Sequence, residues 1–434
     1  KPTKLINLVG RTTMFKLYSA IDYICIDIAN CVGDQGSFRG DKELFEDRIQ
    51  WVKDHYHELD SFVELADNKP QYIKAVHALR EVVAGKPTGH LVGLDASCSG
   101  IQLMSVMTGC IKGADATGLV TEKRADAYTD VTVAMNNILK LKGFTEVSIL
   151  RSDIKRCVMT AGYGSTLVPK EVFGEGELLA TFYQASMQVA QGAFELMPAL
   201  LNTWQPNALS HNWVMPDNFH VNIKVMQSKE VRVEVDELNH ATFTTYVKIN
   251  QGSEKGLANV ANLTHSVDSY LLRSVIRRAS FDECLVKTVH KLMDAELTLR
   301  GLGDGHTVTD IEERLQHMLD IYAECNMVDV SIIDLINANS IGYVPTPLLA
   351  KLFVILTKML ELGSSPVLTV HDAYFAHPNH CNAVRYWYKE LCSELAESDI
   401  LVFLVSQIVK RKISFKKKSN NLASLIRNSN YGLC

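Results

Sequence analysis

The chain lacks several features that would place it in a common class of protein. No run of apolar residues approaches the roughly 18–20 that a membrane-spanning helix needs, so we expect no membrane partner. The ten cysteines include no Cys-x-x-Cys pair and follow no secretory segment, so we expect reduced thiols and a cytoplasmic protein. The sequence also has no internal repeat, no phosphate-binding P-loop and no low-complexity tract.

What remains is a long, apolar chain with little net charge. It has 434 residues, 47% of them hydrophobic, and a net charge of −5 at pH 7. Such a chain can bury a large core, and we expect two or three subdomains. The negative charge does not exclude nucleic acid, because duplex binding depends on local positive patches. Candidate patches are Arg273, Arg277 and Arg278, and the basic run from Lys410 to Lys418, for which a solvated tail is the competing interpretation.

An aspartate follows each of two short apolar runs. Leu91-Val92-Gly93-Leu94 predicts a buried strand with Asp95 at its carboxyl end, before a small turn and a helix. Val367-Leu368-Thr369-Val370 predicts a second strand, which breaks at His371-Asp372 before another strand begins at Ala373. A lone aspartate in such a place is most often a turn former. Carboxylates are also the ligands that magnesium prefers, so the pair is a candidate metal site.

A basic helix is predicted between these aspartates. Arg151, Lys155 and Tyr163 are spaced by multiples of four residues, which places them along one helix face, and Gly162 and Gly164 mark its end. A solvated face is the ordinary interpretation of such a stripe. Beside two carboxylates, however, Arg and Lys can neutralise phosphate oxygens. The combination is typical of nucleotidyl transfer with two magnesium ions about 3.5–4 Å apart.

At these residues the chain resembles the single-subunit, phage- and mitochondrial-type DNA-dependent RNA polymerases, which are relatives of the family A DNA polymerases. The three segments that resemble the catalytic motifs of this family are Asp95–Gln102, Lys155–Ser165 and His371–Ala373. Further similar segments, colinear from about residue 20 to the end, are Ala29–Gly33, Trp213–Phe219 and Asn262–Asp268.

The resemblance implies a role for each residue of the candidate site. Asp95 and Asp372 would hold two magnesium ions, and Arg151 and Lys155 would bind the incoming triphosphate. Tyr163 would sense the ribose 2′-hydroxyl.

Four further residues would complete this site. Gly100 would leave room for Tyr163, and the template base would be held near Gly164 at the end of the same helix. His265 and His371 would support the nascent product and the second catalytic turn.

The same comparison favours ribonucleotides over deoxyribonucleotides. Family A DNA polymerases place an acidic steric gate after the turn of the first motif, where this chain has Ser99-Gly100-Ile101-Gln102. They usually carry an aromatic residue where Met159 stands, and their third motif ends in His-Asp-Glu instead of His371-Asp372-Ala373. A family A-like DNA polymerase fragment and a non-catalytic scaffold are the alternatives. The scaffold is disfavoured because every catalytic position is intact.

The fold implied by the resemblance is α+β, a right hand without its thumb and N-terminal domain. Residues 1–112 and 265–434 would form the palm, an antiparallel sheet backed by helices. Residues 113–264 would form the helical fingers. A helical stretch at about 281–345 would be an insertion on the palm, either a surface elaboration or a docking site for a partner.

Two further segments are expected from the family. A specificity hairpin would begin near Trp213, have its tip around Gln227 to Glu230, and enter the promoter groove. The segment Leu422 to Cys434 would fold back toward the active site.

A second subunit is also expected. In the family a large N-terminal part precedes the palm and supplies the thumb and an arginine motif, which Asn7-Leu8-Val9-Gly10-Arg11 mimics. Here the Asn30-Cys31 signature comes very early, so the chain is either a processed fragment beginning at Lys1 or one subunit of two. The second interpretation resembles the catalytic subunit of the two-subunit middle RNA polymerase of N-four-type phages. Its partner would cover an apolar surface near Leu5 to Tyr18.

The remaining partners follow from the same resemblance. They are a DNA template, an RNA product, ribonucleoside triphosphates and an accessory factor such as a single-stranded DNA-binding protein. The location would be the host cytoplasm if the chain is encoded by a phage.

Overall fold

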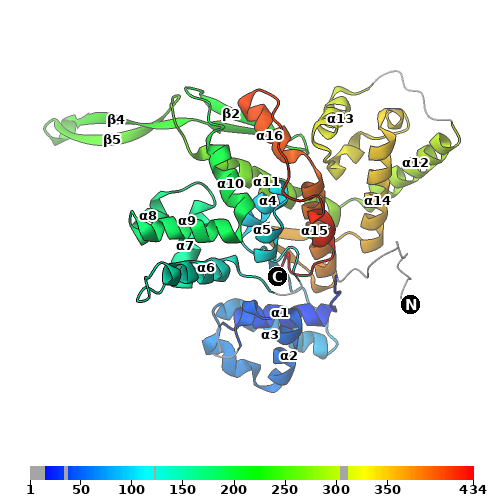
Figure 1. Ribbon diagram of the computed structural model, residues 1–434. Helices are drawn as coiled ribbons and strands as arrows, with labels where there is room; N and C mark the ends of the chain where they lie inside the picture. The colour runs from blue at the N-terminus through cyan, green and yellow to red at the C-terminus, as the bar shows by residue number, and fades with distance from the viewer. Residues whose placement is uncertain (1–14, 34–37, 122–123, 304–310) are drawn as a thin grey trace.

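The computed structural model describes residues 15–33, 38–121, 124–303 and 311–434. The chain is built mainly of helices around small antiparallel sheets (Figure 1), so the predicted α+β class is confirmed. The segment Asn7–Arg11 and most of the expected partner surface lie outside the described residues. None of the described helices combines the length and the apolar character needed to cross a membrane.

A three-stranded sheet lies at the centre of the molecule, in the order β1-β7-β6. Its strands are β1 (Val92–Asp95), β6 (Val367–Val370) and β7 (Ala373–Ala376), all antiparallel to their neighbours. The predicted strand, tight turn and strand around Asp372 are therefore confirmed. Side chains alternate across the sheet, so that Leu94 and Tyr374 are buried on one face while Asp95 and Val370 are on the other.

Helices from distant parts of the chain pack around the sheet. The first group, which is blue in Figure 1, packs together at one end of the molecule and consists of α1 (Ala20–Cys31), α2 (Phe45–Asp54) and α3 (Lys69–Val83). The second group contacts β6, β7 or α4 (Ser99–Thr108) and consists of α11 (Ala258–Ala279) and α15 (Cys381–Glu397). The strand β1, which ends at Asp95, and the β6–β7 hairpin, which carries Asp372 in its turn, therefore rest on a core assembled from distant segments.

A helical region follows α4 and the short helix α5 (Ile111–Ala116). Its helices are α6 (Ala127–Leu141), α7 (Arg151–Ala161), α8 (Leu167–Phe173), α9 (Glu177–Val189) and α10 (Gln191–Leu201). The predicted basic helix is α7, and it ends just before Gly162 as expected. The buried side chains of α7, such as Ile154 and Val158, lie on the face opposite its exposed polar residues.

Two hairpins follow in place of the single predicted one. The first pairs β2 (Ser210–Val214) with β3 (His220–Lys224), and the second pairs β4 (Met226–Val235) with β5 (Ala241–Asn250). The expected tip at Gln227 to Glu230 is wrong, because these residues lie inside β4. The observed tip is Asp236–His240, where Asn239 and His240 both have positive φ angles. The second hairpin extends away from the body of the molecule (Figure 1).

The remaining helices lie in the last third of the chain. They are α12 (Glu283–Gly301), α13 (Glu313–Cys325), α14 (Thr346–Leu362), α16 (Ile400–Val409) and α17 (Leu422–Arg427). Short 3-10 turns at Val330–Leu335 and Ile341–Tyr343 connect α13 with α14.

The predicted positive patch on α11 is wrong. Arg273 donates two hydrogen bonds to Asp217 at 2.7 and 3.0 Å, and Arg277 bonds Asp217 at 2.9 Å. Arg278 is fully buried and forms a bidentate pair with Glu394 at 2.6 and 2.8 Å. These guanidinium groups are neutralised inside the protein and link α11 to its neighbours, so they are not a phosphate-binding surface.

Candidate active site

Asp95 is the last residue of β1, at the entrance to a tight turn. Its carboxylate Oδ1 accepts a hydrogen bond from the backbone N–H of Ala96 at 2.9 Å. Cys98 then adopts a left-handed conformation, with φ +56° and ψ +58°, and α4 begins at Ser99. This reversal lets the chain leave the strand directly into a helix and keeps the Asp95 side chain at the edge of the sheet.

Asp372 reaches the same edge from the other side of the sheet. It lies in the turn between β6 and β7, where His371 has a φ of +55°. Both Asp95 and Val370 pair with Ala373, so the turn places Asp372 beside the end of β1. Burial and then the Asp372 carboxylate raise the pKa of Asp95. The two predicted metal ligands are therefore brought together, and each negative charge is costly to its neighbour.

Arg151 and Lys155 come from the first turns of α7. Arg151 is fixed by Asp126, the N-cap of α6, through a hydrogen bond from its Nε and an ion pair with its Nη2, both of 2.7 Å. Its guanidinium also lies over the ring of Tyr128, 5.5 Å from the centroid. Although burial raises it, the pKa of Asp126 stays below its usual value because of the Arg151 guanidinium. Arg151 is therefore held in a defined position by α6.

Tyr163 lies just beyond α7 and is enclosed by two other elements. Its ring stacks on His265 of α11, with centroids 4.7 Å apart and planes 11° apart. A Cβ at Gly100 would lie 2.8 Å from the Tyr163 hydroxyl oxygen, so glycine is needed for this approach. Burial raises the pKa of the Tyr163 hydroxyl, which is therefore a neutral hydrogen-bonding group at physiological pH.

These side chains share one cavity of about 780 Å³. The predicted site residues that line it are Asp95, Gly100, Arg151, Lys155, Tyr163, His265, His371 and Asp372. Gly164 does not line it. This residue has a φ of +87°, and a Cβ there would lie 3.3 Å from Val260, so its role in the structure is a close approach to α11.

Five charged residues of the cavity were missed by the sequence reasoning. They are Asp41, Lys42, Arg124, Asp126 and Asp268. The spacing of Asp268 could have indicated its place in the site, because it follows His265 by three residues on one helix and so lies on the same face. Burial and then Asp372 raise the pKa of Asp268 to about 6. The other four residues lie outside the recognised motifs, and only the fold brings them to the cavity.

The segment Ser429–Cys434 reaches the end of β1 through its last two residues, Leu433 and Cys434. The backbone N–H of Asp95 donates to the carbonyl of Cys434 at 3.1 Å, and the N–H of Cys434 donates to the carbonyl of Asp95 at 3.0 Å. Arg385 and Lys389 of α15 donate to carbonyls of this segment, at 2.8 Å for Asn430 and 2.9 Å for Ser429. The end of β1 at Asp95 is thus held by β7 on one side and by Cys434 on the other.

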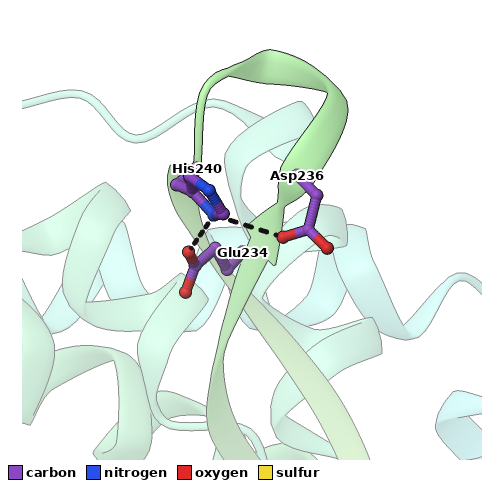
Figure 2. Close-up of side chains that lie close together, drawn as sticks. All are labelled: Glu234, Asp236 and His240. Atoms are coloured by element: carbon purple, nitrogen blue, oxygen red, sulfur yellow. Dashed lines mark ion pairs between the residues drawn. The ribbon is translucent and has the colours of Figure 1, made fainter.

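A second acidic cluster lies at the tip of the β4–β5 hairpin. Figure 2 shows His240 between Glu234 and Asp236, with ion pairs of 2.7 and 3.3 Å. All three side chains are exposed, and none of them lines the cavity. The imidazole already bonds both carboxylates, so this cluster is a surface ion-pair network separate from the candidate active site.

Clustered carboxylates beside lysine and arginine, at the edge of a small antiparallel sheet, form the kind of site used by nucleotidyltransferases. The family comparison agrees with this class. Residues 18–191 match the model of the family described as DNA-dependent RNA polymerase. No curated protein matches the chain. The matched residues include Asp95, Lys155 and Tyr163 and end before His265 and Asp372.

The match confirms the predicted enzyme class, a DNA-dependent RNA polymerase. This family implies a DNA template, ribonucleoside triphosphates and an RNA product.

Proposed function

We propose that this chain catalyses DNA-templated addition of ribonucleotides with two magnesium ions held by Asp95 and Asp372. One observation carries the proposal. The two carboxylates, the cations of α7 and the ring of Tyr163 come from separate elements and line a single cavity. A hydroxyl nucleophile and a triphosphate need these groups together, because phosphoryl transfer depends on positioning and on stabilisation of negative charge.

The donor chemistry of the cavity fits a divalent cation. Asp95 and Asp372 offer hard oxygen ligands, and burial and then the Asp372 carboxylate raise the pKa of Asp95, so a bound cation would stabilise its ionised form. Bound magnesium would supply Lewis-acid activation of the attacking hydroxyl and stabilisation of the leaving oxygen. The chain itself supplies the orientation of both carboxylates, through the β1–β7–β6 pairing and the two left-handed turn residues Cys98 and His371.

The remaining groups bind and select the nucleotide. Lys155 and Arg151 stabilise the triphosphate. Asp126 fixes the orientation of Arg151 by accepting a hydrogen bond at one edge of its guanidinium. Tyr163 presents its hydroxyl beside Gly100, where a sugar hydroxyl would find a hydrogen-bond partner and no side chain in its way. The absence of a carboxylate at this position favours ribose over deoxyribose.

The metal assignment is tested by Asp95→Asn and Asp372→Asn on a preformed primer–template. Each variant should lower single-nucleotide addition by at least about a hundredfold, because a magnesium ligand is lost while the side-chain volume is kept. Asp294→Asn is the matched control, since Asp294 is exposed on α12 and outside the cavity. Extension by either active-site variant at the rate of the control would overturn the assignment.

We further propose that a second polymerase subunit supplies the thumb and the N-terminal part, as in the two-subunit enzymes of N-four-type phages. The proposal rests on the resemblance of the chain to the catalytic subunit of those enzymes. A processed fragment of one longer chain is the alternative. An accessory factor for DNA opening belongs to the same proposal.

The subunit proposal is tested by purifying the chain alone and together with the product of the neighbouring gene. RNA synthesis is compared on primed and single-stranded templates. We expect short products from the chain alone and processive synthesis from the pair, because a thumb holds the RNA–DNA hybrid. Full processivity of the lone chain would refute the split enzyme.

A further inference from the structure

The cations of the cavity differ in how far the protein itself neutralises them. Lys42 forms an ion pair with Asp41, and Arg151 forms one with Asp126 at 2.7 Å. Arg124 and Lys155 also line the cavity, but neither forms an ion pair with another residue of the described ranges. Two positive charges therefore remain available to a ligand, and the family resemblance assigns a role only to Lys155.

Arg124 is held in place through neutral acceptors. Its Nε donates to the backbone carbonyl of Asp41 at 3.0 Å, and its Nη1 donates to the hydroxyl of Ser97. Ser97 lies two residues after Asp95, in the turn that leads to α4. The guanidinium is thus fixed at the Asp95 end of the cavity, close enough to help lower the pKa of that carboxyl. Within the described chain, its Nη2 donors form no hydrogen bond.

We infer that Arg124 is a further triphosphate-binding residue, one that contacts the β- or γ-phosphate of the incoming nucleotide. The inference rests on the proposed function. A planar guanidinium with free donors, partly removed from water and without a carboxylate partner, suits phosphate oxygens. The guanidinium is anchored to Asp41, in the short 3-10 helix Gly40–Lys42, and to Ser97, in the turn before α4. The side chain is therefore already ordered before a nucleotide binds.

A purely structural role is the competing explanation. In that case Arg124 would only connect the 3-10 helix Gly40–Lys42 to the turn after β1. Its loss would then affect every ligand of the cavity alike. A phosphate contact predicts a different result, because only ligands that carry the outer phosphates would lose binding energy.

The test measures binding of ATP, ADP and AMP by calorimetry in magnesium buffer, for the whole chain together with its partner subunit where one is required. Arg124→Gln should weaken ATP binding by roughly ten- to hundredfold, as for a lost charge-assisted hydrogen bond, and change AMP binding by less than about twofold. Arg124→Lys should recover part of the ATP affinity. Arg80→Gln is the control, because Arg80 is paired with Asp60 at 2.6 Å outside the cavity.

Single-nucleotide extension provides a second readout. Arg124→Gln should raise KM for the nucleotide more than it lowers kcat, since the contact already exists in the bound ground state. Equal weakening of ATP and AMP, or unchanged ATP affinity, would overturn the inference while leaving the proposed function intact. A wild-type protein that binds ATP no better than AMP and extends no primer would overturn both.

Discussion

Tyr163 is held by residues that lie far from it in the sequence. His265 stacks on one face of its ring, and the missing side chain of Gly100 leaves space for its hydroxyl. The position of this hydroxyl therefore depends on three elements, α4, α7 and α11. Substitutions in any of these elements that shift the hydroxyl should affect sugar selection more than the rate of phosphoryl transfer.

We expect Gly100→Ala to reduce sugar discrimination, because the new Cβ would lie 2.8 Å from the Tyr163 hydroxyl oxygen and displace it. Tyr163→Phe removes a hydrogen bond worth about 0.5–1.5 kcal/mol, so preference for ribose should fall by roughly two- to tenfold with polymerisation retained. The measurement is the ratio of kcat/KM for a ribonucleotide and its deoxy analogue. Unchanged ratios in both variants would show that Tyr163 has only a structural role.

Asp268 makes a pH-dependent contribution to stability. Its folded pKa of about 6 lies above the ordinary aspartate value of 3.8, so folding favours the protonated form. The stability this provides is fully present below pH 3.8 and is lost as the pH rises through about 6. In Asp268→Asn the side chain stays neutral at every pH. Between pH 4 and pH 8 the free energy of unfolding of this variant should therefore fall by up to about 3 kcal/mol less than that of wild type.

The check is urea unfolding of wild type and Asp268→Asn in metal-free buffer, because a bound cation would change the charge balance. Asp294→Asn, on an exposed part of α12, should retain the wild-type pH dependence. Identical slopes for wild type and Asp268→Asn would mean that folding does not raise the pKa of Asp268.

At the scale of elements, the β4–β5 hairpin stands apart from the rest of the molecule. Its strands pair with each other over their full length, and no other element of the described residues packs extensively against them. A lone two-stranded hairpin adds little to the stability of a domain. The carboxylates at its tip are unfavourable beside DNA phosphates, so a contact with DNA would have to involve the basic residues Lys229, Arg232 and Lys248 further down the strands.

Replacing Lys229–Val247 by an Asn-Gly turn between the paired residues Ser228 and Lys248 tests the role of the hairpin. The free energy of unfolding should change by less than about 1 kcal/mol, because no core is removed. Primer extension should be retained, while start-site use or separation of the product should be impaired. Equal loss of both activities would show that the hairpin only supports the fold.

At the scale of the whole molecule, residues near the two ends of the sequence meet at the candidate active site. Cys434 forms two backbone hydrogen bonds with Asp95, and Gln102 donates to the carbonyl of Gly432 at 3.4 Å. Tyr431 stacks on Phe45, with centroids 4.9 Å apart. The strand that carries Asp95 is therefore tied to α15 and α2 through the last residues of the chain.

Deletion of Leu433 and Cys434 should lower kcat for nucleotide addition by roughly five- to hundredfold. Two backbone hydrogen bonds at Asp95 would be lost, each worth about 0.5–1.5 kcal/mol. Cys434→Ser is the matched control, since it keeps both backbone bonds and should retain activity. The measurement is extension of a primer by one nucleotide, with circular dichroism to verify folding. Wild-type kcat in the deletion variant would contradict this role of the segment.

Local sequence patterns were enough to predict the elements that carry the site. The apolar runs before Asp95 and Asp372 predicted β1 and β6, and the four-residue spacing from Arg151 to Tyr163 predicted α7. These features follow from side-chain periodicity and from glycine near a helix end, which act over a few residues. For this reason they could be recognised without knowledge of the fold.

The fold, by contrast, determines which charges meet. It paired Arg151 with Asp126, placed Arg124 beside Ser97, brought Asp268 close enough to Asp372 to shift its pKa, and buried Arg278 against Glu394. It also moved the hairpin tip to Asp236–His240. An arginine that binds phosphate and one that neutralises a buried carboxylate have the same local sequence signal. Their difference lies in partners that folding brings from distant parts of the chain, and electrostatic energy depends on those distances and on burial.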